Sequence, residues 1–285
     1  MELGRHADPA TVREAVRLAL AEDIGPGDIT GAVTVEAQVR GRGVFLAKQS
    51  GVLAGLDVAA ECFRQVDESV AFERLVGEGE RFAAGDHLAT VEGPARALLA
   101  AERVALNFLQ RLCGVATLTR RFADAVEGTR AVIVDTRKTT PGLRALEKAA
   151  VLAGGGRNHR FALYDGVLIK DNHIAVAGGV KQAIERARAG APHTMKIEIE
   201  TTTLEQVRQA LAAGADIIML DNMDLQTMAE AVALVDGRAL VEASGGMTPE
   251  RVRAVAETGV DLISAGSITH SAPAVDISLE IETSG

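Results

Sequence analysis

The chain has 285 residues, of which 47% are hydrophobic and 24% are charged, values typical of a folded protein and not of a disordered one. Thirty Lys and Arg against 39 Asp and Glu give a net charge of −9, which argues against general binding to nucleic acid or to acidic membranes. No apolar run approaches the ~18 residues of a membrane helix, and the N-terminal sequence has no signal or transit-peptide pattern. Cys62 and Cys113 form no metal or redox motif, as is typical of a reducing cytoplasm.

The first part of the chain, residues 1–112, has the pattern of an α+β layer. Residues 11–23 predict an amphipathic helix, begun by a capping box of Thr11 and Glu14. Glycine turns in residues 77–86 separate strand-like runs, and Pro94 opens a longer helix. The strand-like runs are 41–47, 51–56 and 87–91. The apolar residues at helical spacing after Pro94 are Leu98, Ala101, Ala105, Leu109 and Leu112.

From about residue 130 onward, short apolar runs alternate with helical segments. Six runs predict buried strands: 131–134, 166–169, 196–199, 216–220, 239–243 and 261–265. Helices are predicted over 142–153, 180–189, 204–213, 225–235 and 249–257, the last beginning at a Thr248-Pro249 cap. Such repeated units predict a parallel sheet with helices outside it. An incomplete barrel of six or seven units and a doubly wound open sheet are the two alternatives.

Each predicted strand in this second part ends in polar residues or glycines. The carboxyl ends of parallel strands face one side, so these residues should meet at one mouth. A polar residue after any single strand is usually an ordinary loop residue, but six such ends in succession favour a binding site. The ends are Asp135–Lys138, Lys170–His173, Glu200, Asp221-Asn222, Ser244–Gly246 and Gly266-Ser267.

The cations at this mouth predict an anionic ligand. Arg137, Lys138, Lys170 and the pair His159-Arg160 concentrate positive charge in a chain that is negative overall. Cations held close together repel one another unless anions or acids compensate them. Arginine can bind a carboxylate through two parallel hydrogen bonds, and lysine offers a point charge for phosphate.

Small residues and acids complete the predicted site. Ser244–Gly246 and Gly266-Ser267 allow backbone N–H groups to approach a phosphate, which barrels often bind after their last strands. Glu200 and Asp221 could be metal ligands, acid–base catalysts or acceptors for ribose hydroxyls. A carboxylate beside a sugar also stabilises positive charge at the anomeric carbon. These residue types together predict a phosphorylated sugar that reacts with an anionic co-substrate.

One long segment resembles a known family. It is DTRKTTPGLRALEKAAVLAGGGRNHRFALYDGVLIKDNHI (135–174), which closely resembles quinolinate phosphoribosyltransferase, the decarboxylating nicotinate-nucleotide pyrophosphorylase. Further matching motifs lie in the right order over nearly the whole chain: LAEDIGPGDIT (20–30), AERVALNFLQRLCGVAT (101–117), ADIIMLDNM (215–223), EASGGMT (242–248) and DLISAGSITHSAPAVDISLEI (261–281). The resemblance implies an α/β chain: an N-terminal α/β sandwich (1–112, joined by 275–285) and an incomplete, about seven-stranded, TIM-like parallel α/β barrel (113–274).

The resemblance also implies an activity and its residues. Quinolinate and phosphoribosyl pyrophosphate would give nicotinate mononucleotide, pyrophosphate and CO₂, a step of de novo NAD biosynthesis that uses Mg²⁺ held mainly through the donor and water. By position, the quinolinate-binding residues are Arg103, Thr136, Arg137, Lys138, His159, Arg160 and Lys170. The donor-binding residues are Lys138, Lys170, Glu200, Asp221, Ser244, Gly245, Gly246, Ala265, Gly266 and Ser267, of which Lys138, Lys170, Glu200 and Asp221 are the catalytic candidates.

The resemblance implies a homodimer, or a higher oligomer, in which the neighbouring subunit supplies Arg103. The composition and the two cysteines predict a cytoplasmic protein with no nucleic-acid or membrane partner. Two positions depart from the family pattern. Cys113 stands where many relatives have serine, and Phe161 replaces the small residue that often follows the His-Arg pair. Phe161 adjoins the quinolinate cations, so the departure bears on the shape of the pocket.

Three alternatives remain open from the sequence. A paralogue associated with molybdenum transport would keep the phosphate loops and alter the carboxylate clamp. The clamp residues Arg137, His159, Arg160 and Lys170 are all present, which favours quinolinate. A Schiff-base aldolase would need Lys170 desolvated and neutral, but Asp171 beside it favours a charged lysine. A non-catalytic phosphosugar-binding barrel would bind the donor without consuming it.

Overall fold

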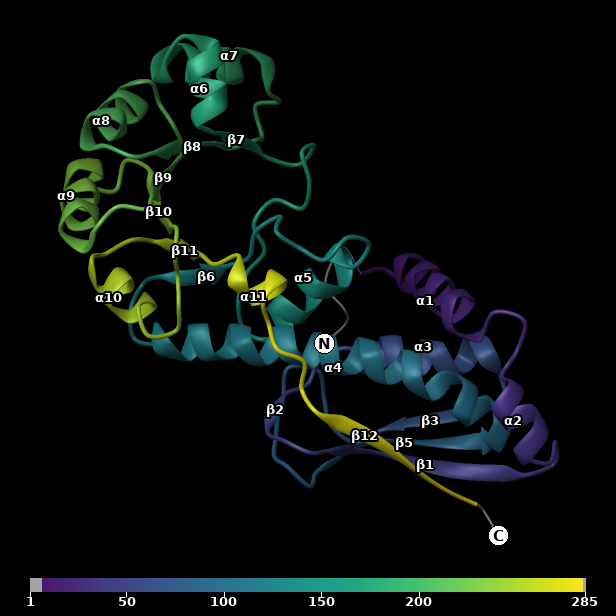
Figure 1. The fold of residues 1–285 in the computed structure, drawn as a ribbon. Helices are drawn as coiled ribbons and strands as arrows, with labels where there is room; N and C mark the ends of the chain where they lie inside the picture. The colour runs from purple at the N-terminus through teal and green to yellow at the C-terminus, as the bar shows by residue number, and fades with distance from the viewer. Residues whose placement is uncertain (1–6, 284–285) are drawn as a thin grey trace. The chain divides into compact units, whose positions relative to one another are not determined.

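The computed structural model describes residues 7–283 (Figure 1), and these residues divide into two compact units. The first comprises 7–120, 139–155 and 271–283, and the second comprises 121–138 and 156–270. This division differs from the predicted one, because the boundary between residues 112 and 113 lies inside a single uninterrupted helix, α4 (Ala95–Ala125). A stretch between the first two strands of the second unit also returns to the first unit.

The first unit is an antiparallel sheet with helices on one face (Figure 1). Its strand order is β12-β1-β5-β3, so the last strand of the chain pairs with the first one. The rings of Phe45, Phe63 and Phe72 pack together with centroids 5.7 to 6.1 Å apart and fill the core between sheet and helices. The elements are α1 (Pro9–Ile24), α2 (Ile29–Thr34), β1 (Arg40–Ala47), β2 (Gly51–Val52), α3 (Leu56–Val66), β3 (Ala71–Arg74), β4 (Arg81–Phe82), β5 (His87–Pro94), most of α4, α5 (Arg144–Ala153) and β12 (Ile277–Thr283).

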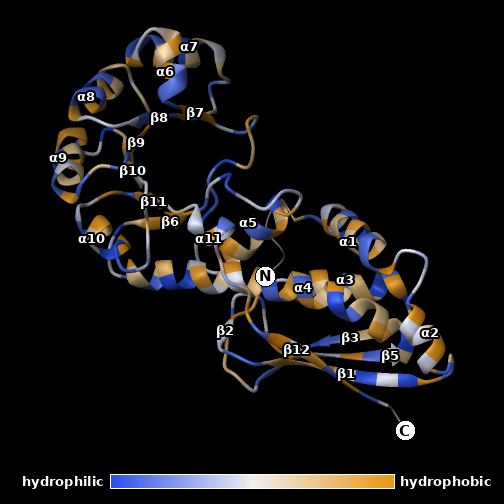
Figure 2. Cartoon of the chain, viewed as in Figure 1, coloured by the Kyte–Doolittle hydropathy of each residue, from blue (hydrophilic) through white to orange (hydrophobic). Residues whose placement is uncertain are grey.

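Helix α4 has the amphipathic pattern that the sequence predicts. Hydrophobic and hydrophilic residues alternate along this helix in Figure 2. The five apolar residues predicted on its buried face, Leu98, Ala101, Ala105, Leu109 and Leu112, are all buried, which confirms the predicted helical spacing.

Two local predictions in the first unit are wrong. The side chain that caps α1 is Asp8, which accepts hydrogen bonds from the N–H groups of Ala10 and Thr11, so Thr11 lies inside the helix. The predicted strand over 51–56 ends at Val52, and α3 begins at Leu56. Here the backbone N–H groups of Gly55 and Leu56 donate to the Glu78 carboxylate, which supplies the first turn with acceptors that a local pattern does not reveal.

A buried ion pair joins three separate segments of the first unit. Glu147 on α5 is fully buried, and its Oε1 accepts from Nη2 of Arg111 on α4 at 2.8 Å and from the hydroxyl of Thr140 at 2.7 Å. The same Arg111 donates through Nη1 to the carbonyl of Ala272 at 2.9 Å. These bonds connect α4, the stretch 139–155 and the chain leading to β12, which explains why these segments form one unit.

The second unit is a curled parallel sheet with helices outside it (Figure 1). Strands β7 to β11 lie side by side in chain order, and β6 pairs with β11, so the sheet follows a barrel with a seam between β6 and β7. A doubly wound sheet would reverse its order near the middle. The elements are β6 (Val132–Val134), β7 (Val167–Ile169), α6 (Asp171–Ala177), α7 (Val180–Gly190), β8 (Ile197–Thr201), α8 (Leu204–Ala212), β9 (Ile217–Asp221), α9 (Leu225–Val235), β10 (Leu240–Ser244), α10 (Val252–Glu257), β11 (Leu262–Ser264) and α11 (Ser267–His270).

All six predicted strands of this unit are confirmed, but the expected number of about seven is corrected to six. In place of a further strand, a single parallel bridge joins Val134 to Arg157. Beyond that bridge the N–H of His159 donates to the carboxylate of Asp135 and cannot join a ladder. The Thr248-Pro249 cap is also corrected, because residues 249–251 form a turn and α10 begins at Val252.

Two simple sequence inferences can be compared with the structure. Across residues 7–283, no helix combines the length and the apolar character needed to cross a membrane. Cys62 and Cys113 are both buried and free, and burial raises the pKa of the Cys113 thiol to about 12. Neither thiol is therefore a reactive thiolate at neutral pH.

Candidate active site

The carboxyl ends of β6 to β11 lie along one edge of the curled sheet, because all six strands are parallel. The pairing register places Asp221, the last residue of β9, opposite Ser244, the last residue of β10. Glu200 on β8 pairs with Met219, which lies two residues before Asp221 on β9. The predicted acids and the first predicted phosphate loop are therefore neighbours at this edge.

Two arginines form the strongest anion-binding feature of the second unit. Arg137 follows β6 and Arg160 precedes β7, and both are half-buried. Burial and the nearby charge of Arg137 lower the pKa of the Arg160 guanidinium. Nη1 of Arg160 donates to the carbonyl of Gly166 at 2.9 Å, but the Nε atoms of both arginines are buried without a hydrogen-bond partner among residues 7–283. Two desolvated like charges with unused donors are stabilised by a bound anion.

His159 is held by groups on three sides. Its backbone N–H donates to buried Asp135 at 2.8 Å, and its ring Nδ1 accepts from the N–H of Arg160 at 2.7 Å. Its ring Nε2 lies 2.9 Å from Oε2 of Glu198 and 3.8 Å from Oε2 of Glu242. The sequence predicts His159 as a ligand-binding cation, but the structure directs its ring Nε2 to two buried acids in the barrel interior.

Lys170 and Glu200 form an ion pair at the end of β7 and β8. The ammonium of Lys170 lies 3.0 Å from Oε2 of Glu200. His173, one turn into α6, accepts the backbone N–H of Lys170 through Nδ1 at 3.0 Å, which gives this histidine a structural role at the start of the helix. The pair brings one cation and one anion to the same place, so each neutralises the other.

The loop after β10 packs against the end of β9. Asn222 has a left-handed backbone with φ of 55°, donates through its N–H to the carbonyl of Ser244 at 3.1 Å, and donates through Nδ2 to Asp221 at 2.9 Å. Arg251 donates to the carbonyls of Gly245 and Gly246 at 3.3 and 3.4 Å. Since these carbonyls are bound by Arg251, their oxygens are turned towards that side chain.

Lys138 is associated with the second predicted phosphate loop. Its carbonyl accepts from the hydroxyl of Thr269 at 2.8 Å, and its N–H donates to Thr136 at 3.0 Å. A Cβ added at Gly266 would lie 2.9 Å from Cδ of Lys138, so the lysine stem crosses directly over this glycine. The exposed ammonium of Lys138 is thereby placed beside the loop that contains Ala265 and Ser267.

Three other sequence-selected residues lie outside this group. Arg103 is exposed on α4 in the first unit, and its role stays a prediction. Cys113 is buried on the same helix, where its thiol accepts the N–H of Ala54, which indicates a packing role. Phe161 is half-buried, and its N–H donates to Asp165 at 2.6 Å.

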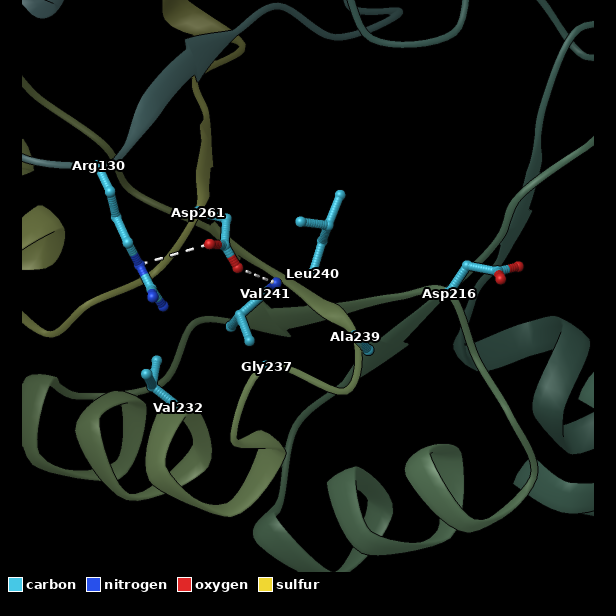
Figure 3. A pocket seen from close by; sticks show the side chains of 8 residues that line it. All are labelled: Arg130, Asp216, Val232, Gly237, Ala239, Leu240, Val241 and Asp261. Carbon is cyan, nitrogen blue, oxygen red and sulfur yellow. Dashed lines mark hydrogen bonds and ion pairs between the residues drawn. The ribbon is translucent and has the colours of Figure 1, made fainter.

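A separate pocket lies at the other end of the same strands (Figure 3). Asp216 precedes β9 and Asp261 precedes β11, so the pocket adjoins the amino ends of the strands. Asp261 accepts the N–H of Val241 at 2.8 Å and pairs with Arg130 at 3.4 Å. Active sites of parallel barrels lie at the carboxyl ends. The charges here already have partners, because Arg130 pairs with Asp261 and Asp216 pairs with Arg188 at 2.7 Å, so the pocket offers no free charge to a ligand.

The comparisons with known proteins agree with this geometry. The model described as "Quinolinate phosphoribosyl transferase, N-terminal domain" matches residues 28–113, and the model for the C-terminal domain matches residues 115–280. The chain belongs to the quinolinate phosphoribosyltransferase family. A probable nicotinate-nucleotide pyrophosphorylase [carboxylating] of Bacillus subtilis is 46% identical over 92% of this chain and 91% of its own length.

Other members of the family come from plants and bacteria. A chloroplastic nicotinate-nucleotide pyrophosphorylase of Oryza sativa is 43% identical over 95% of this chain and 78% of its own length. The solved structure of NadC from Streptococcus pyogenes superimposes with a TM-score of 0.94 at 40% identity and covers 97% of this chain and 98% of that one. The nicotinate-nucleotide pyrophosphorylase structure from Francisella tularensis gives 0.90 at 37% identity, with 96% of each chain covered.

Sequence reasoning missed four residues that organise this family site: Asp135, Glu198, Glu242 and Arg251. Asp135 is the first residue after a predicted strand and has no further signal in the sequence. Glu198 and Glu242 stand within apolar strand runs, KIEI and ALVEA. A carboxylate at a buried strand position is costly without a partner, and this signal in the sequence could have identified both acids.

Proposed function

We propose that this chain transfers the phosphoribosyl group of phosphoribosyl pyrophosphate to quinolinate with decarboxylation, yielding nicotinate mononucleotide, pyrophosphate and CO₂ in NAD biosynthesis. The observation that carries the proposal is the arginine pair. Arg137 and Arg160 have unused, buried Nε donors, and neither forms a salt bridge with a carboxylate among residues 7–283. Two guanidinium groups suit an acceptor with two carboxylates, because each can bind one of them through parallel hydrogen bonds.

The donor is proposed to bind at the ends of β8 to β11. Glu200 and Asp221 would accept hydrogen bonds from the ribose hydroxyls, and the loops Ser244–Gly246 and Ala265–Ser267 would hold the 5′-phosphate. As the pyridine nitrogen attacks, positive charge grows at the anomeric carbon and negative charge grows on the leaving pyrophosphate. The two acids stabilise the first charge, and Lys138 stabilises the second.

Lys170 and Glu200 would exchange their mutual ion pair for contacts with the bound substrates. In the structure the two side chains neutralise each other at 3.0 Å. When the donor binds, its ribose hydroxyls would take Glu200 and its pyrophosphate or the acceptor carboxylate would take Lys170. Both groups are then charged and face the reacting atoms. Charged groups placed in this way stabilise the opposite charges that develop in the transition state, which lowers the activation free energy.

Mg²⁺ is proposed to enter with the donor. Magnesium prefers oxygen ligands and commonly binds through phosphates, water and one or two carboxylates. Glu200 is paired with Lys170 and Asp221 accepts from Asn222, so these acids do not form a cage made of protein alone. This fits an ion carried by the pyrophosphate, where it would neutralise the leaving group.

Decarboxylation follows from the first bond formed. Once the ring nitrogen carries four bonds, the C–C bond to the adjacent carboxylate breaks, CO₂ leaves, and the electron pair stays on the ring carbon beside the positive nitrogen. A proton then adds to that carbon. The role of the desolvated arginine pocket is to hold the ring in place and exclude water while this charge-separated species exists.

The working enzyme is proposed to be a cytoplasmic homodimer or higher oligomer. Arg103 is exposed on α4 and is supported in this role by the resemblance described above. An arginine supplied by a neighbouring subunit would add a further cation to the acceptor pocket. Analytical ultracentrifugation and an Arg103→Ala variant test this directly: a monomeric, fully active protein would contradict it.

The assignment is tested with quinolinate, phosphoribosyl pyrophosphate and Mg²⁺, with nicotinate as the parallel acceptor, by following CO₂ and mononucleotide. We expect product from quinolinate alone. Arg137→Ala and Arg160→Ala should lose quinolinate binding and keep most donor binding. The control is Arg208→Ala, since Arg208 is exposed and pairs with Glu205 on the outer helix α8. Equal loss of both ligands in the two site variants would contradict the division of roles.

A further inference from the structure

Two acids lie inside the barrel, one layer below the predicted site. Glu198 on β8 and Glu242 on β10 are 4% and 0% exposed, and β9 separates their strands. Side chains alternate along a strand, so Glu198 faces the same interior as Glu200, two residues later. One atom each of Glu198, Glu242 and His159 lies within 4.8 Å of the others. We call Glu198 and Glu242 the carboxyl pair.

The carboxyl pair cannot hold two full charges at neutral pH. Two carboxylates desolvated at this distance repel strongly, so one of them retains a proton. Burial and the charge of Glu198 raise the pKa of Glu242, against the opposing effects of His159 and the nearby Ser264 hydroxyl. Both oxygens of Glu242 and Oε1 of Glu198 have no hydrogen-bond partner among residues 7–283. A proton shared by the pair would satisfy the oxygens that geometry otherwise leaves unpaired.

The charge of the carboxyl pair is directed at His159. Nδ1 of the ring accepts from the N–H of Arg160, so the ring hydrogen is on Nε2, which points at Glu198. Because Nδ1 of the same ring accepts the backbone N–H of Arg160, orienting the ring also positions the backbone of Arg160. The charged groups that face Glu242 are Glu198 and His159. Asp135 accepts the backbone N–H of His159, and the charges of Arg137, Glu198 and Asp165 act on Arg160.

We propose that Glu198 and Glu242 are positioning residues for the acceptor: with one shared proton and one negative charge, they orient His159 and Arg160 and set the charge beneath the arginine pair. The proposal rests on the phosphoribosyl transfer proposed above. When this shared proton leaves at alkaline pH, an additional negative charge lies next to Arg160. Binding of a dicarboxylate acceptor then weakens, while the donor loops on β10 and β11 are less affected.

The first test is the pH dependence of the KM for quinolinate in the wild type and in Glu242→Gln. The amide replaces a neutral acid of almost the same shape and cannot ionise. In the wild type KM should rise with pH, approaching about tenfold per pH unit once the pair loses its proton. In Glu242→Gln this rise should be absent, and the KM for the donor should follow the same course in both proteins.

A matched control is Glu78→Gln in the first unit. Burial also raises the pKa of Glu78, whose carboxylate accepts the N–H groups of Gly55 and Leu56. This variant should keep the alkaline rise in KM for quinolinate. If Glu242→Gln retains the wild-type rise, or if Glu78→Gln abolishes it, the proposal is overturned.

A second test needs no turnover and separates this proposal from the proposed function. Infrared difference spectra of the wild type should show the carbonyl stretch of a protonated carboxyl at neutral pH, and that band should disappear on titration to alkaline pH and be missing from Glu242→Gln. If Glu242→Gln does not fold, Glu78→Gln makes the assignment, because the band of the carboxyl pair should remain in that variant. No titrating acid band in the wild type would overturn the proposal, whereas a band in a protein that fails to consume quinolinate would count against the proposed function only.

Discussion

Replacing Gly245 with alanine should disable the donor site through two separate effects. Gly245 has φ of +95°, and left-handed backbone costs a residue with a Cβ about 1–2 kcal/mol. The new Cβ would also lie 2.5 Å from Cγ of Asn222, which is closer than these atoms can approach, and 3.0 Å from its Nδ2, which is a tight contact. Asn222 is itself left-handed and bound to the Ser244 carbonyl, so the overlap is relieved by moving the loop.

The displacement should reach the reacting atoms. Nδ2 of Asn222 donates to Asp221 at 2.9 Å, so an asparagine pushed away by the new methyl group releases this carboxylate. The strain alone, if it acts on the bound state, corresponds to about 5- to 30-fold in affinity for the donor. Loss of the Asp221 orientation adds a decrease in kcat, because that acid is assigned to the charge at the anomeric carbon.

Steady-state kinetics with each substrate varied in turn measures this effect. Gly245→Ala should raise the KM for phosphoribosyl pyrophosphate and lower kcat, with little change in the KM for quinolinate. Gly266→Ala is the matched control: its backbone is not left-handed, and the new Cβ meets only the flexible end of Lys138 at 2.9 Å and His270 at 3.3 Å. A milder donor defect is expected there.

A double variant identifies the cause. Asn222→Gly removes the side chain that Gly245→Ala would strike and tolerates the same left-handed backbone. On its own it should impair turnover by freeing Asp221, but in combination the two defects should be less than additive. Fully additive losses, or a Gly245→Ala protein with wild-type kinetics, would refute the reasoning.

Three further predictions concern charge. Lys170→Ala should lower kcat by about 10²-fold or more because it removes a cation aimed at the developing charge, while Lys181→Ala, at an exposed position of α7, should leave kcat as it is. Equal kcat values for these two variants would contradict the role of the Lys170–Glu200 pair. Glu147→Ala should lower the free energy of unfolding by about 1.5–3 kcal/mol, measured in urea, because it leaves the half-buried guanidinium of Arg111 without its carboxylate; a loss below about 1 kcal/mol would contradict this. The folded protein binds more protons at Glu242 than the unfolded chain does, since the pKa of Glu242 is raised. The free energy of unfolding should therefore fall as pH rises from the ordinary glutamate range to the raised pKa, and thermal melts of Glu242→Gln should lack this fall.

The regular elements of the second unit follow from local sequence alone. Runs such as 216–220 and 239–243 are apolar because both faces of a parallel strand are covered, and each became a strand within one or two residues. The placement of Asp221 and Ser244 side by side also follows, because parallel strands present their carboxyl ends to one edge. The spacing of apolar residues along the sequence indicates which residues are buried, and the strands of this unit were predicted from burial.

The same periodicity does not say which segment covers a strand or which partner receives a polar group. The first unit takes back residues 139–155 and 271–283, because Arg111 binds Glu147 and the carbonyl of Ala272 across large separations in sequence. The number of strands fell to six because the N–H of His159 is used by Asp135.

The sequence by itself determined the strand–helix rhythm, the family and the residue types at the mouth, since each of these is carried by neighbouring residues. Only the tertiary structure decided that Nε2 of His159 points inward to Glu198 and that Glu242 joins them. The physical reason is that the charge of a buried acid depends on its distance to other buried groups. That distance exists only once β8 and β10 have folded around β9.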